Sequence, residues 1–184
     1  MAVLRISKVI LFAILAAGIL GAGCLSPSSC SPQEVTPGIY QGSQPRTPAD
    51  FAALRRRGIR TILSVEVLTC HVVPEARLAR QNGFVFRNIP ILPSPVPPRQ
   101  QSVQRVLLTL RDASLYPIFL HCYTGTDRTT FITGLYRIYY LGWTPEAAWR
   151  QMLREGFHPR WWLYGFKTYF WSHTTIPAWA QASP

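Results

Sequence analysis

Nine consecutive residues combine a thiol, a glycine and a guanidinium at a spacing that could bind and attack a phosphate group. They run from His121 to Thr129 and read His-Cys-Tyr-Thr-Gly-Thr-Asp-Arg-Thr. A loop that opens a helix directs backbone N–H groups, and the partial positive charge of the helix N-terminus, at an anion. Gly125 permits the positive φ that a tight loop needs, and the Arg128 guanidinium can bind two phosphate oxygens at once. The segment is therefore a candidate phosphate-binding loop.

Cys122 would lie at the base of this loop, where electropositive surroundings favour a thiolate over a thiol. A thiolate that faces a bound phosphoryl group is a nucleophile for phosphoryl transfer. The residues alone thus predict a hydrolase of phosphate esters that works through its cysteine, without a metal or another cofactor. No pair of CxxC motifs and no HExxH motif occurs, so neither a structural zinc site nor a zinc protease is expected.

The segment also matches the pattern His-Cys-x5-Arg-Ser/Thr with a glycine at the third spacer position, and so resembles the cysteine-dependent protein tyrosine and dual-specificity phosphatase superfamily. The resemblance covers residues 38–171. GIYQGSQPRTPADFAALRRRGIRTILSV is similar to the N-terminal segment of bacterial members, and YRIYYLGWTPEAAWRQMLREGFHP is similar to their C-terminal helices. The resemblance implies a dual-specificity-phosphatase-like α/β fold and hydrolysis of a phosphorylated protein or a small phosphate ester.

The resemblance also implies a role for each position of the loop. Cys122 would form a phosphocysteine intermediate, and the Arg128 side chain would bind phosphate together with backbone N–H groups. Those N–H groups belong to Tyr123, Thr124, Gly125, Thr126, Asp127 and Arg128. Thr129 would donate a hydrogen bond to the cysteine sulfur when it leaves, and His121 would set the loop conformation and the acidity of the thiol or serve only as a buried structural residue. Thr130 departs from the usual glycine after the Arg-Thr pair, so a local change in packing is expected there.

The general acid is the main departure from the superfamily. Many members carry this aspartate on a separate loop well before the cysteine, but the corresponding residues 92–101 hold no carboxylate here. Glu75 falls within an expected helix, and Asp112 falls at a helix end, where capping a turn is the simpler role. Asp127, inside the loop, is therefore the candidate acid and then base. The alternative is a carboxylate that only orients the loop through an ion pair or a cap.

The elements that must position the loop alternate between strands and helices. This alternation is typical of an α/β domain with a central, mostly parallel sheet flanked by helices. The expected strands lie in residues 38–45, 59–68, 84–91 and 116–120. The expected helices begin at Thr47 and cover residues 74–82, 101–113, 129–141, 144–155 and 160–171.

The N-terminus is expected to act as an export or anchoring segment. Arg5 and Lys8 precede the uncharged apolar residues 9–20, and small residues lead to Cys24. Residues 1–24 are therefore interpreted as a signal peptide or membrane anchor. ILGAGC also resembles a bacterial lipoprotein cleavage site, and this alternative would make Cys24 a lipidation site. Residues 25–37 are expected to be a Ser/Pro linker and residues 38–184 the phosphatase domain. The predicted location is exported, either periplasmic or attached to a membrane.

Composition and charge limit the classes of protein and of partner that remain. The 184 residues are 48% hydrophobic, enough for one domain with a packed core and too apolar for a disordered chain. The net charge of +11 favours an anionic partner. Only Lys8 and Lys167 of the 19 basic residues are lysines, and this skew is attributed to the base composition of the genome. No nucleic-acid partner is predicted.

Three rival functions stay open. An acid inside the loop is compatible with a phosphoinositide or small-molecule phosphatase as well as with a protein phosphatase. A sulfur transferase also carries a cysteine on a loop before a helix, although its loop is usually shorter and gives Thr129 no purpose. A phosphate-binding pseudophosphatase is motivated by the missing separate acid.

Outside the loop, further features carry hypotheses. Cys70 could form a protective disulfide with Cys122 outside the cytoplasm. His158 and Arg160 could reach the rim of the site, or could simply belong to a turn. The aromatic residues within 161–171 are expected to pack in the core, with a membrane interface as the alternative.

Overall fold

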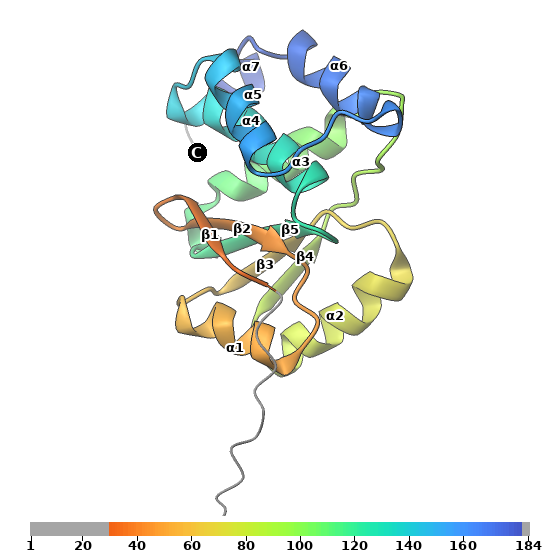
Figure 1. The fold of residues 1–184 in the computed structure, drawn as a ribbon. Coiled ribbons are helices and arrows are strands. Elements are labelled where there is room, and N and C mark those ends of the chain that lie inside the picture. Colours follow the sequence, from red (N-terminus) through yellow and green to blue (C-terminus); the bar gives the residue numbers. More distant parts are fainter. Residues whose placement is uncertain (1–29, 182–184) are drawn as a thin grey trace, which may run out of the picture.

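A five-stranded sheet runs through the middle of the domain, with helices on both of its faces (Figure 1). The computed structural model describes residues 30–181. The strand order is β1-β2-β5-β3-β4, and only β1 runs antiparallel to its neighbour. The bounds are β1 Gln33–Thr36, β2 Ile39–Ser43, β3 Thr61–Ser64, β4 Val85–Asn88 and β5 Ile118–Cys122. The expected α/β class with a mostly parallel sheet is confirmed.

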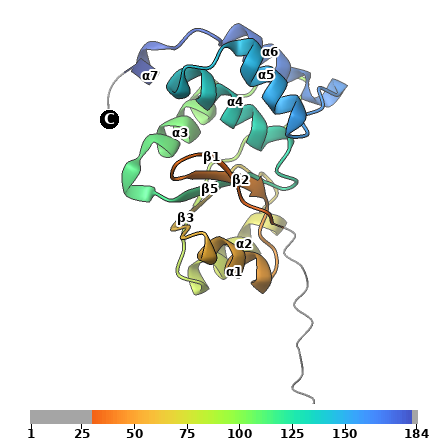
Figure 2. The same ribbon diagram turned by 60° about the vertical axis from the view of Figure 1, so that its left-hand side comes forward.

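The helices form two layers of unequal size (Figures 1 and 2). One face of the sheet carries α1 (Pro48–Arg56) and α2 (Thr69–Gln81). The other face carries α3 (Gln100–Arg111), α4 (Asp127–Leu141), α5 (Pro145–Arg154) and α6 (Tyr164–Ser172). Two 3-10 turns, Ala113–Leu115 and Trp161–Leu163, and the short helix α7 (Ala178–Gln181) complete the described chain.

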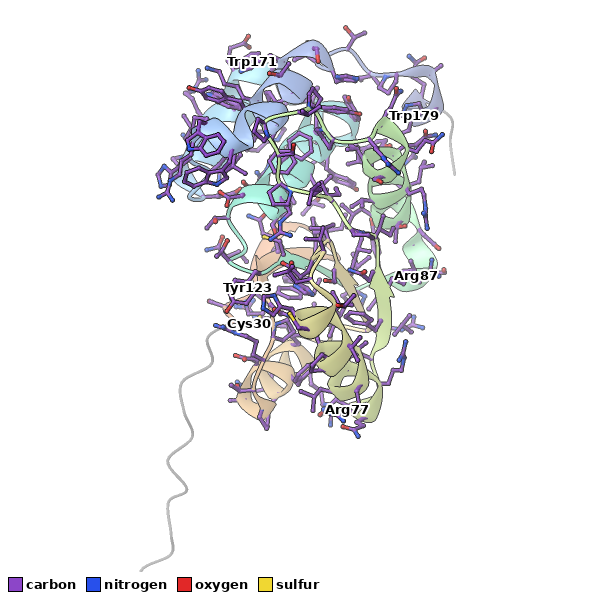
Figure 3. All side chains as sticks on the ribbon, turned by 90° about the vertical axis from the view of Figure 1, so that its right-hand side faces the viewer. Cys30, Arg77, Arg87, Tyr123, Trp171 and Trp179 are labelled. Carbon is purple, nitrogen blue, oxygen red and sulfur yellow. The ribbon has the colours of Figure 1, made fainter. Side chains whose placement is uncertain are left out.

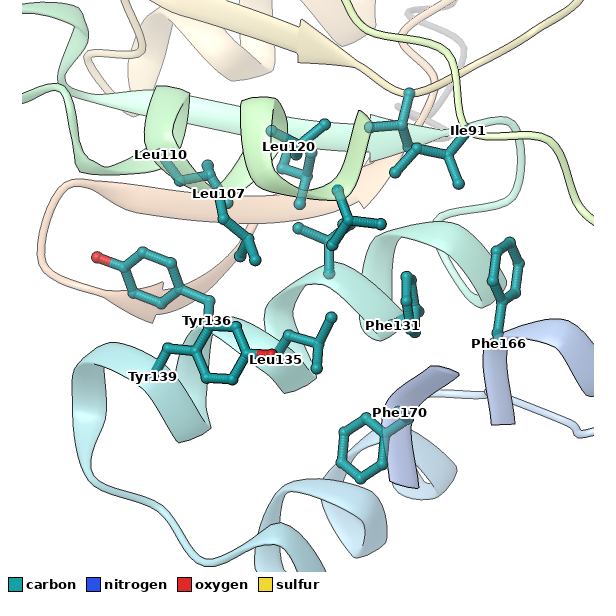
Figure 4. Close-up of a cluster of buried hydrophobic side chains, with 14 of the residues drawn as sticks. Ile91, Leu107, Leu110, Leu120, Phe131, Leu135, Tyr136, Tyr139, Phe166 and Phe170 are labelled. Carbon is teal, nitrogen blue, oxygen red and sulfur yellow. The ribbon is translucent and has the colours of Figure 1, made fainter. Parts of the chain in front are cut away.

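Each layer has its own hydrophobic core. The larger core packs α3, α4 and α6 against β5, with Leu120, Phe131 and Phe170 among its fully buried side chains (Figure 4). The smaller core lies under α1 and α2 and is centred on Phe51 and Phe119. Because β5 contributes to both cores, its carboxyl end, where the candidate loop begins, is held from both faces.

Local chemistry explains where several elements begin and end. Thr47 and Asp50 form a capping box at the start of α1, where the sequence predicts that a helix begins. Gly142, with a φ of 68°, ends α4 in the left-handed region. The strand expected over residues 59–68 is shorter, because the Glu66 carboxylate accepts the N–H groups of Val67 and Leu68 and turns the chain out of the sheet.

The expected linker over residues 25–37 is wrong at its end, because β1 lies within it. Cys30 is buried, and its N–H donates to Asp50 Oδ1 over 3.0 Å, so the domain begins before residue 38. Burial, with Asp50 and Glu75 nearby, raises the pKa of the Cys30 thiol to about 12. The interpretation of residues 1–24 as a signal or anchor, and of Cys24 as a lipidation site, lies outside the described residues. Within residues 30–181, no helix is both long and apolar enough to cross a membrane.

Candidate active site

The candidate loop connects β5 to α4 at the carboxyl edge of the sheet. β5 ends at Cys122 and α4 begins at Asp127, so only four residues make the turn. Gly125 has a φ of 79°, and a Cβ there would collide with the backbone of Gly42 and Ser43 at the end of β2. Glycine is therefore required at position 125 for two reasons, the positive φ of the turn and the close approach of the neighbouring strand.

The loop curls over the sulfur of Cys122. The Gly125 N–H donates to Cys122 Sγ over 3.3 Å, and the cysteine side chain is fully buried at the end of β5. An N–H directed at the sulfur is the arrangement that stabilises negative charge there. One member of the amide ring that the sequence predicts, the Gly125 N–H, is thus directed at the thiol; the orientation of the other amides stays a prediction.

The Arg128 guanidinium is held in place through one of its terminal nitrogens, while the other has no hydrogen-bond partner among the described residues. Its Nη2 lies 2.9 Å from Glu66 Oε2, and both side chains are almost completely buried. Burial raises the pKa of Glu66, but the Leu68 N–H and the Arg128 charge outweigh burial, and the pKa lies below its ordinary value. Arg128 Nη1 is buried with no hydrogen-bond partner among residues 30–181. A charged donor held in place and left unpaired is suited to a phosphate oxygen.

Asp127 lies beside that guanidinium and is half-buried. Burial raises its pKa, against the opposing charges of Arg128, Arg160 and His158. The turn that carries the latter two residues lies against the loop, because Gly156 faces the Thr126 side chain. A half-buried carboxyl group with a raised pKa on the candidate loop is a candidate proton donor. The hypothesis that His158 and Arg160 reach the rim is consistent with this arrangement.

Thr129 forms no hydrogen bond to the sulfur in this structure, and the hydrogen bond expected when the sulfur leaves stays a prediction. The Thr129 hydroxyl is buried without a hydrogen-bond partner among the described residues. The sulfur instead accepts from the Gly125 N–H, which the tight turn brings above it. The neighbouring Thr130 hydroxyl donates to the carbonyl oxygens of Thr126 and Asp127, which accounts locally for a threonine where glycine is usual.

His121 belongs to a polar chain behind the loop. Its Nε2 lies 2.7 Å from Glu75 Oε1, and its Nδ1 lies 3.1 Å from the Cys122 carbonyl oxygen. Glu75 Oε2 in turn accepts from Gln44 Nε2 over 2.7 Å. His121 is fully buried and does not contact the sulfur, which fits the expected supporting role. It positions the backbone that carries the nucleophile.

The outer residues of the loop form its rim. The Tyr123 ring stacks on His71 with 4.6 Å between ring centroids, and Tyr123 Oη accepts from Arg46 Nη1 over 3.1 Å. The hydroxyls of Thr124 and Thr126 are hydrogen-bonded over 2.8 Å. Figure 3 shows Tyr123 toward the same edge of the domain as Cys30, where the described chain begins.

The segment that would carry a separate acid is an apolar, proline-rich loop. Leu92, Ser94 and residues 96–99 line a cavity of about 510 Å³ together with Val67, Pro90, Ile91 and Ser102. This proline-rich loop is attached to α6, because the Gly165 N–H donates to the Ser94 carbonyl oxygen over 3.2 Å. No carboxylate lines this cavity. Asp112, the other carboxylate considered, accepts from the Ser114 N–H and caps the 3-10 turn, as predicted.

Two carboxylates at the site were not predicted as functional residues. The sequence pattern predicts Glu66 within a buried strand and Glu75 within a helix. In the structure, Glu66 pairs with Arg128 and Glu75 pairs with His121. Carboxylates are seldom fully buried without a partner, so an acid within an apolar strand pattern was the signal available for Glu66. No group of histidine, cysteine and carboxylate side chains in residues 30–181 is suited to hold a metal ion.

The hypotheses on the aromatic residues and on Cys70 have different outcomes. Of the aromatic residues in 161–171, three pack in the core as expected, namely Phe166, Tyr169 and Phe170. Four others are exposed, namely Trp161, Trp162, Tyr164 and Trp171. Cys70 is exposed in the first turn of α2, whereas Cys122 is buried, and both carry free thiols here. The disulfide between them stays a prediction.

The architecture and the strand–loop–helix site together define the fold of dual-specificity and tyrosine phosphatase-like structures. The catalytic core of the PP-IP phosphatase Siw14 from S. cerevisiae is similar with a TM-score of 0.65 and 20% identity, over 78% of this chain and 86% of that one. TpbA from P. aeruginosa is similar with a TM-score of 0.64 and 22% identity, over 80% and 91% of the two chains. The human tyrosine phosphatase-like serine/threonine/tyrosine-interacting protein aligns at 0.58 and 18%, over 78% and 98%. No protein-family model and no curated protein matches the sequence.

Proposed function

We propose that this protein is a phosphate monoester hydrolase that acts through a cysteinyl-phosphate intermediate. The observation that carries the proposal is that one short loop holds both a backbone donor directed at the thiol and an unpaired charged donor. The Gly125 N–H points at the Cys122 sulfur, and the buried, unpaired Nη1 of Arg128 follows three residues later. Structural similarity to TpbA, which was also crystallised with phosphotyrosine, supports the same chemistry.

In the first step, the Cys122 thiolate attacks phosphorus. The S–P bond forms while the P–O bond to the leaving group breaks, and the Asp127 carboxyl group gives its proton to the leaving oxygen. The amides of residues 123–128 and the Arg128 guanidinium bind the three non-bridging oxygens, where charge is concentrated in phosphoryl transfer. Glu66 keeps that guanidinium in place.

In the second step, water completes the reaction. The Asp127 carboxylate takes a proton from the water molecule as its oxygen attacks phosphorus, the S–P bond breaks, and the thiolate and inorganic phosphate are released. Thr129 would assist only after a shift of its hydroxyl toward the sulfur, since no such contact is formed in this structure. The whole cycle uses side chains and backbone of this chain.

Two substrate classes remain within the proposal. Phosphotyrosine-type proteins are the default. A small phosphate ester or phosphoinositide is favoured by one specific observation, the placement of the half-buried Asp127 on the loop itself, with its pKa raised by burial. A phosphate-binding protein without turnover is the rival that the assay below excludes.

The test is hydrolysis of an aryl phosphate by the full-length chain in EDTA and a thiol reductant. We expect phosphate release by the wild type, and a loss of at least about 10⁴-fold in Cys122→Ser, because a serine hydroxyl is a far poorer nucleophile than a thiolate. Cys70→Ser is the matched control and should retain activity. Equal rates in wild type and Cys122→Ser would contradict the proposal, and thiocyanate release from thiosulfate and cyanide would indicate sulfur transfer.

The N-terminal segment adds a proposal about location. We propose that residues 1–24 direct export and tether the domain to a membrane, with Cys24 as the lipidated residue. Cell fractionation of the wild type and Cys24→Ala tests this. Recovery of both in the cytoplasmic fraction would contradict it.

A further inference from the structure

Helix α6 carries aromatic residues on its outer side as well as on its inner side. On the inner side, Phe166, Tyr169 and Phe170 are buried in the larger core. The outer side of an ordinary surface helix is polar. Here the outer side is hollowed over about 500 Å³, and the hollow is lined by five exposed residues, Tyr164, Lys167, Thr168, Trp171 and Ser172. Large apolar side chains that are exposed together on one surface mark a contact site.

The same surface continues into the 3-10 turn that leads into α6. The Tyr164 N–H donates to the Trp161 carbonyl oxygen, and side chains three residues apart eclipse each other in a 3-10 helix. Trp161 therefore extends the outer side of α6 beyond Tyr164. The exposed fractions of these two side chains are 66% and 51%, which is high for aromatic residues. We call Trp161, Tyr164, Lys167 and Trp171 the aromatic face.

The tryptophans at both ends of the aromatic face are supported by neighbouring rings. The Trp171 ring centroid lies 5.5 Å from that of Trp149 and 5.3 Å from that of the buried Phe170. Trp161 is almost perpendicular to Trp162, with 5.6 Å between ring centroids. The exposed rings are therefore held in place without a ligand, and binding through them costs little side-chain entropy.

The charge on the aromatic face and next to it is positive. Lys167 belongs to the face, and Arg160 directly precedes it, with its guanidinium 5.4 Å from the centre of the Trp162 ring. Residues 156–184 contain no aspartate and no glutamate. The last carboxylate before them, Glu155, already pairs with Arg137 over 2.6 Å. A two-fold contact between two copies of this face would bring like charges together, whereas an anionic surface would complement them.

We propose that the aromatic face binds the interfacial region of an anionic lipid bilayer. Tryptophan and tyrosine are enriched at that depth because each has an apolar ring with one polar group at its edge. Lys167 and Arg160 would meet the lipid phosphates, and each basic residue near an anionic leaflet strengthens such binding. The folded domain itself makes this contact, so the contact is separate from the proposed tether in residues 1–24 and does not rest on the proposed hydrolysis.

Fluorescence of the full-length protein tests the contact, because all six tryptophans lie within residues 143–179 and none lies in the proposed tether. The probe is a vesicle of phosphatidylglycerol and phosphatidylcholine whose acyl chains carry bromine, a short-range quencher, either close to the headgroup or close to the chain end. We expect bromine close to the headgroup to remove about a third of the emission, since two of the six tryptophans belong to the face. Bromine at the chain end, or vesicles without phosphatidylglycerol, should remove less.

Three variants locate the contact. Trp161→Phe/Trp171→Phe keeps apolar rings in the face but removes its reporters, so most of the quenching should disappear. The matched control is Trp179→Phe, because Trp179 is partly buried against Tyr139 and Figure 3 shows it apart from Trp171. Lys167→Glu should weaken the quenching by phosphatidylglycerol vesicles, because the new carboxylate repels the lipid phosphates. Circular dichroism checks that each variant is folded.

Several outcomes would overturn the lipid contact. Co-sedimentation of the protein with the vesicles but without quenching would mean that only the N-terminal segment binds lipid. Equal quenching with and without phosphatidylglycerol would reject the anionic surface, and quenching that persists in Trp161→Phe/Trp171→Phe would place the contact elsewhere. A dimer in lipid-free solution that Trp161→Ser/Trp171→Ser separates would assign the aromatic face to a second copy of the chain instead.

Discussion

Two connections leave the carboxyl edge of the sheet toward the larger helical layer, and only one is equipped for chemistry. The β5–α4 connection has four residues, a glycine at positive φ and an N–H that faces the Cys122 sulfur. The β4–α3 connection, residues 89–99, contains five prolines and no carboxylate. Proline has no N–H to offer an anion, so this second loop cannot form a cradle at those positions. The candidate acid, Asp127, directly follows the first connection as the first residue of α4.

The largest effect should come from removing Asp127, the candidate acid that directly follows the β5–α4 connection. Asp127→Asn should slow turnover of an alkyl phosphate about 10²- to 10⁴-fold, because an alkoxide leaving group needs a proton. An activated aryl phosphate should be slowed far less. Steady-state kinetics on both substrates provides the measurement. An equal loss on both would show that Asp127 only orients the loop.

The next largest effect should come from the carboxylate that holds the arginine. Glu66→Gln keeps the shape and removes the charge that faces Arg128 across 2.9 Å. We expect kcat/KM to fall about tenfold, and the affinity of Cys122→Ser/Glu66→Gln for phosphate to fall in parallel. Glu146→Gln, in the first turn of α5, is the control. Unchanged phosphate affinity would argue against a positioning role for Glu66.

A smaller effect concerns pH and stability. Burial raises the pKa of Asp127, so its contribution to stability is present below the pKa of the unfolded chain and is lost as the pH rises through the folded value. Asp127→Asn should therefore raise the free energy of unfolding at neutral pH, by no more than about 1 kcal/mol, and should not do so in acid. Urea unfolding at both pH values checks the sign. Destabilisation at neutral pH would indicate a favourable ion pair instead.

The smallest effect should come from placing an acid on the proline-rich connection. Val96 is 67% exposed, so Val96→Asp should fold normally. In the Asp127→Asn background we expect it to change turnover of the alkyl phosphate by less than about twofold. A recovery of tenfold or more would show that this loop can deliver a proton and would remove the contrast between the two connections.

The same contrast shows what the sequence could predict. The loop motif carries its chemistry within nine residues, so Cys122, Gly125 and Arg128 could be assigned without knowledge of the fold. The missing acid in the second loop was equally visible, because an absence of carboxylates needs no structure. Strand alternation was sufficient for the α/β class and for most helix positions.

The supporting carboxylates could not be assigned in this way. Glu66 meets Arg128 because β3 pairs in parallel with β5 and Ser64 lies opposite His121, which brings the ends of both strands together. Such a register is set by long-range packing and has no local signature. The position of the Thr129 hydroxyl could not be predicted for a related reason, since a contact made by one hydroxyl depends on the exact path of the turn.

The central claim is that Cys122 becomes phosphorylated during turnover. Rapid acid quench of the full-length protein with an aryl phosphate, followed by peptide mass spectrometry, tests it directly. We predict a phosphorylated peptide with the modification on Cys122 in the wild type and a larger trapped fraction in Asp127→Asn, where the attack of water is slowed. Phosphate release without any adduct on Cys122, or with an adduct on another residue, would contradict it.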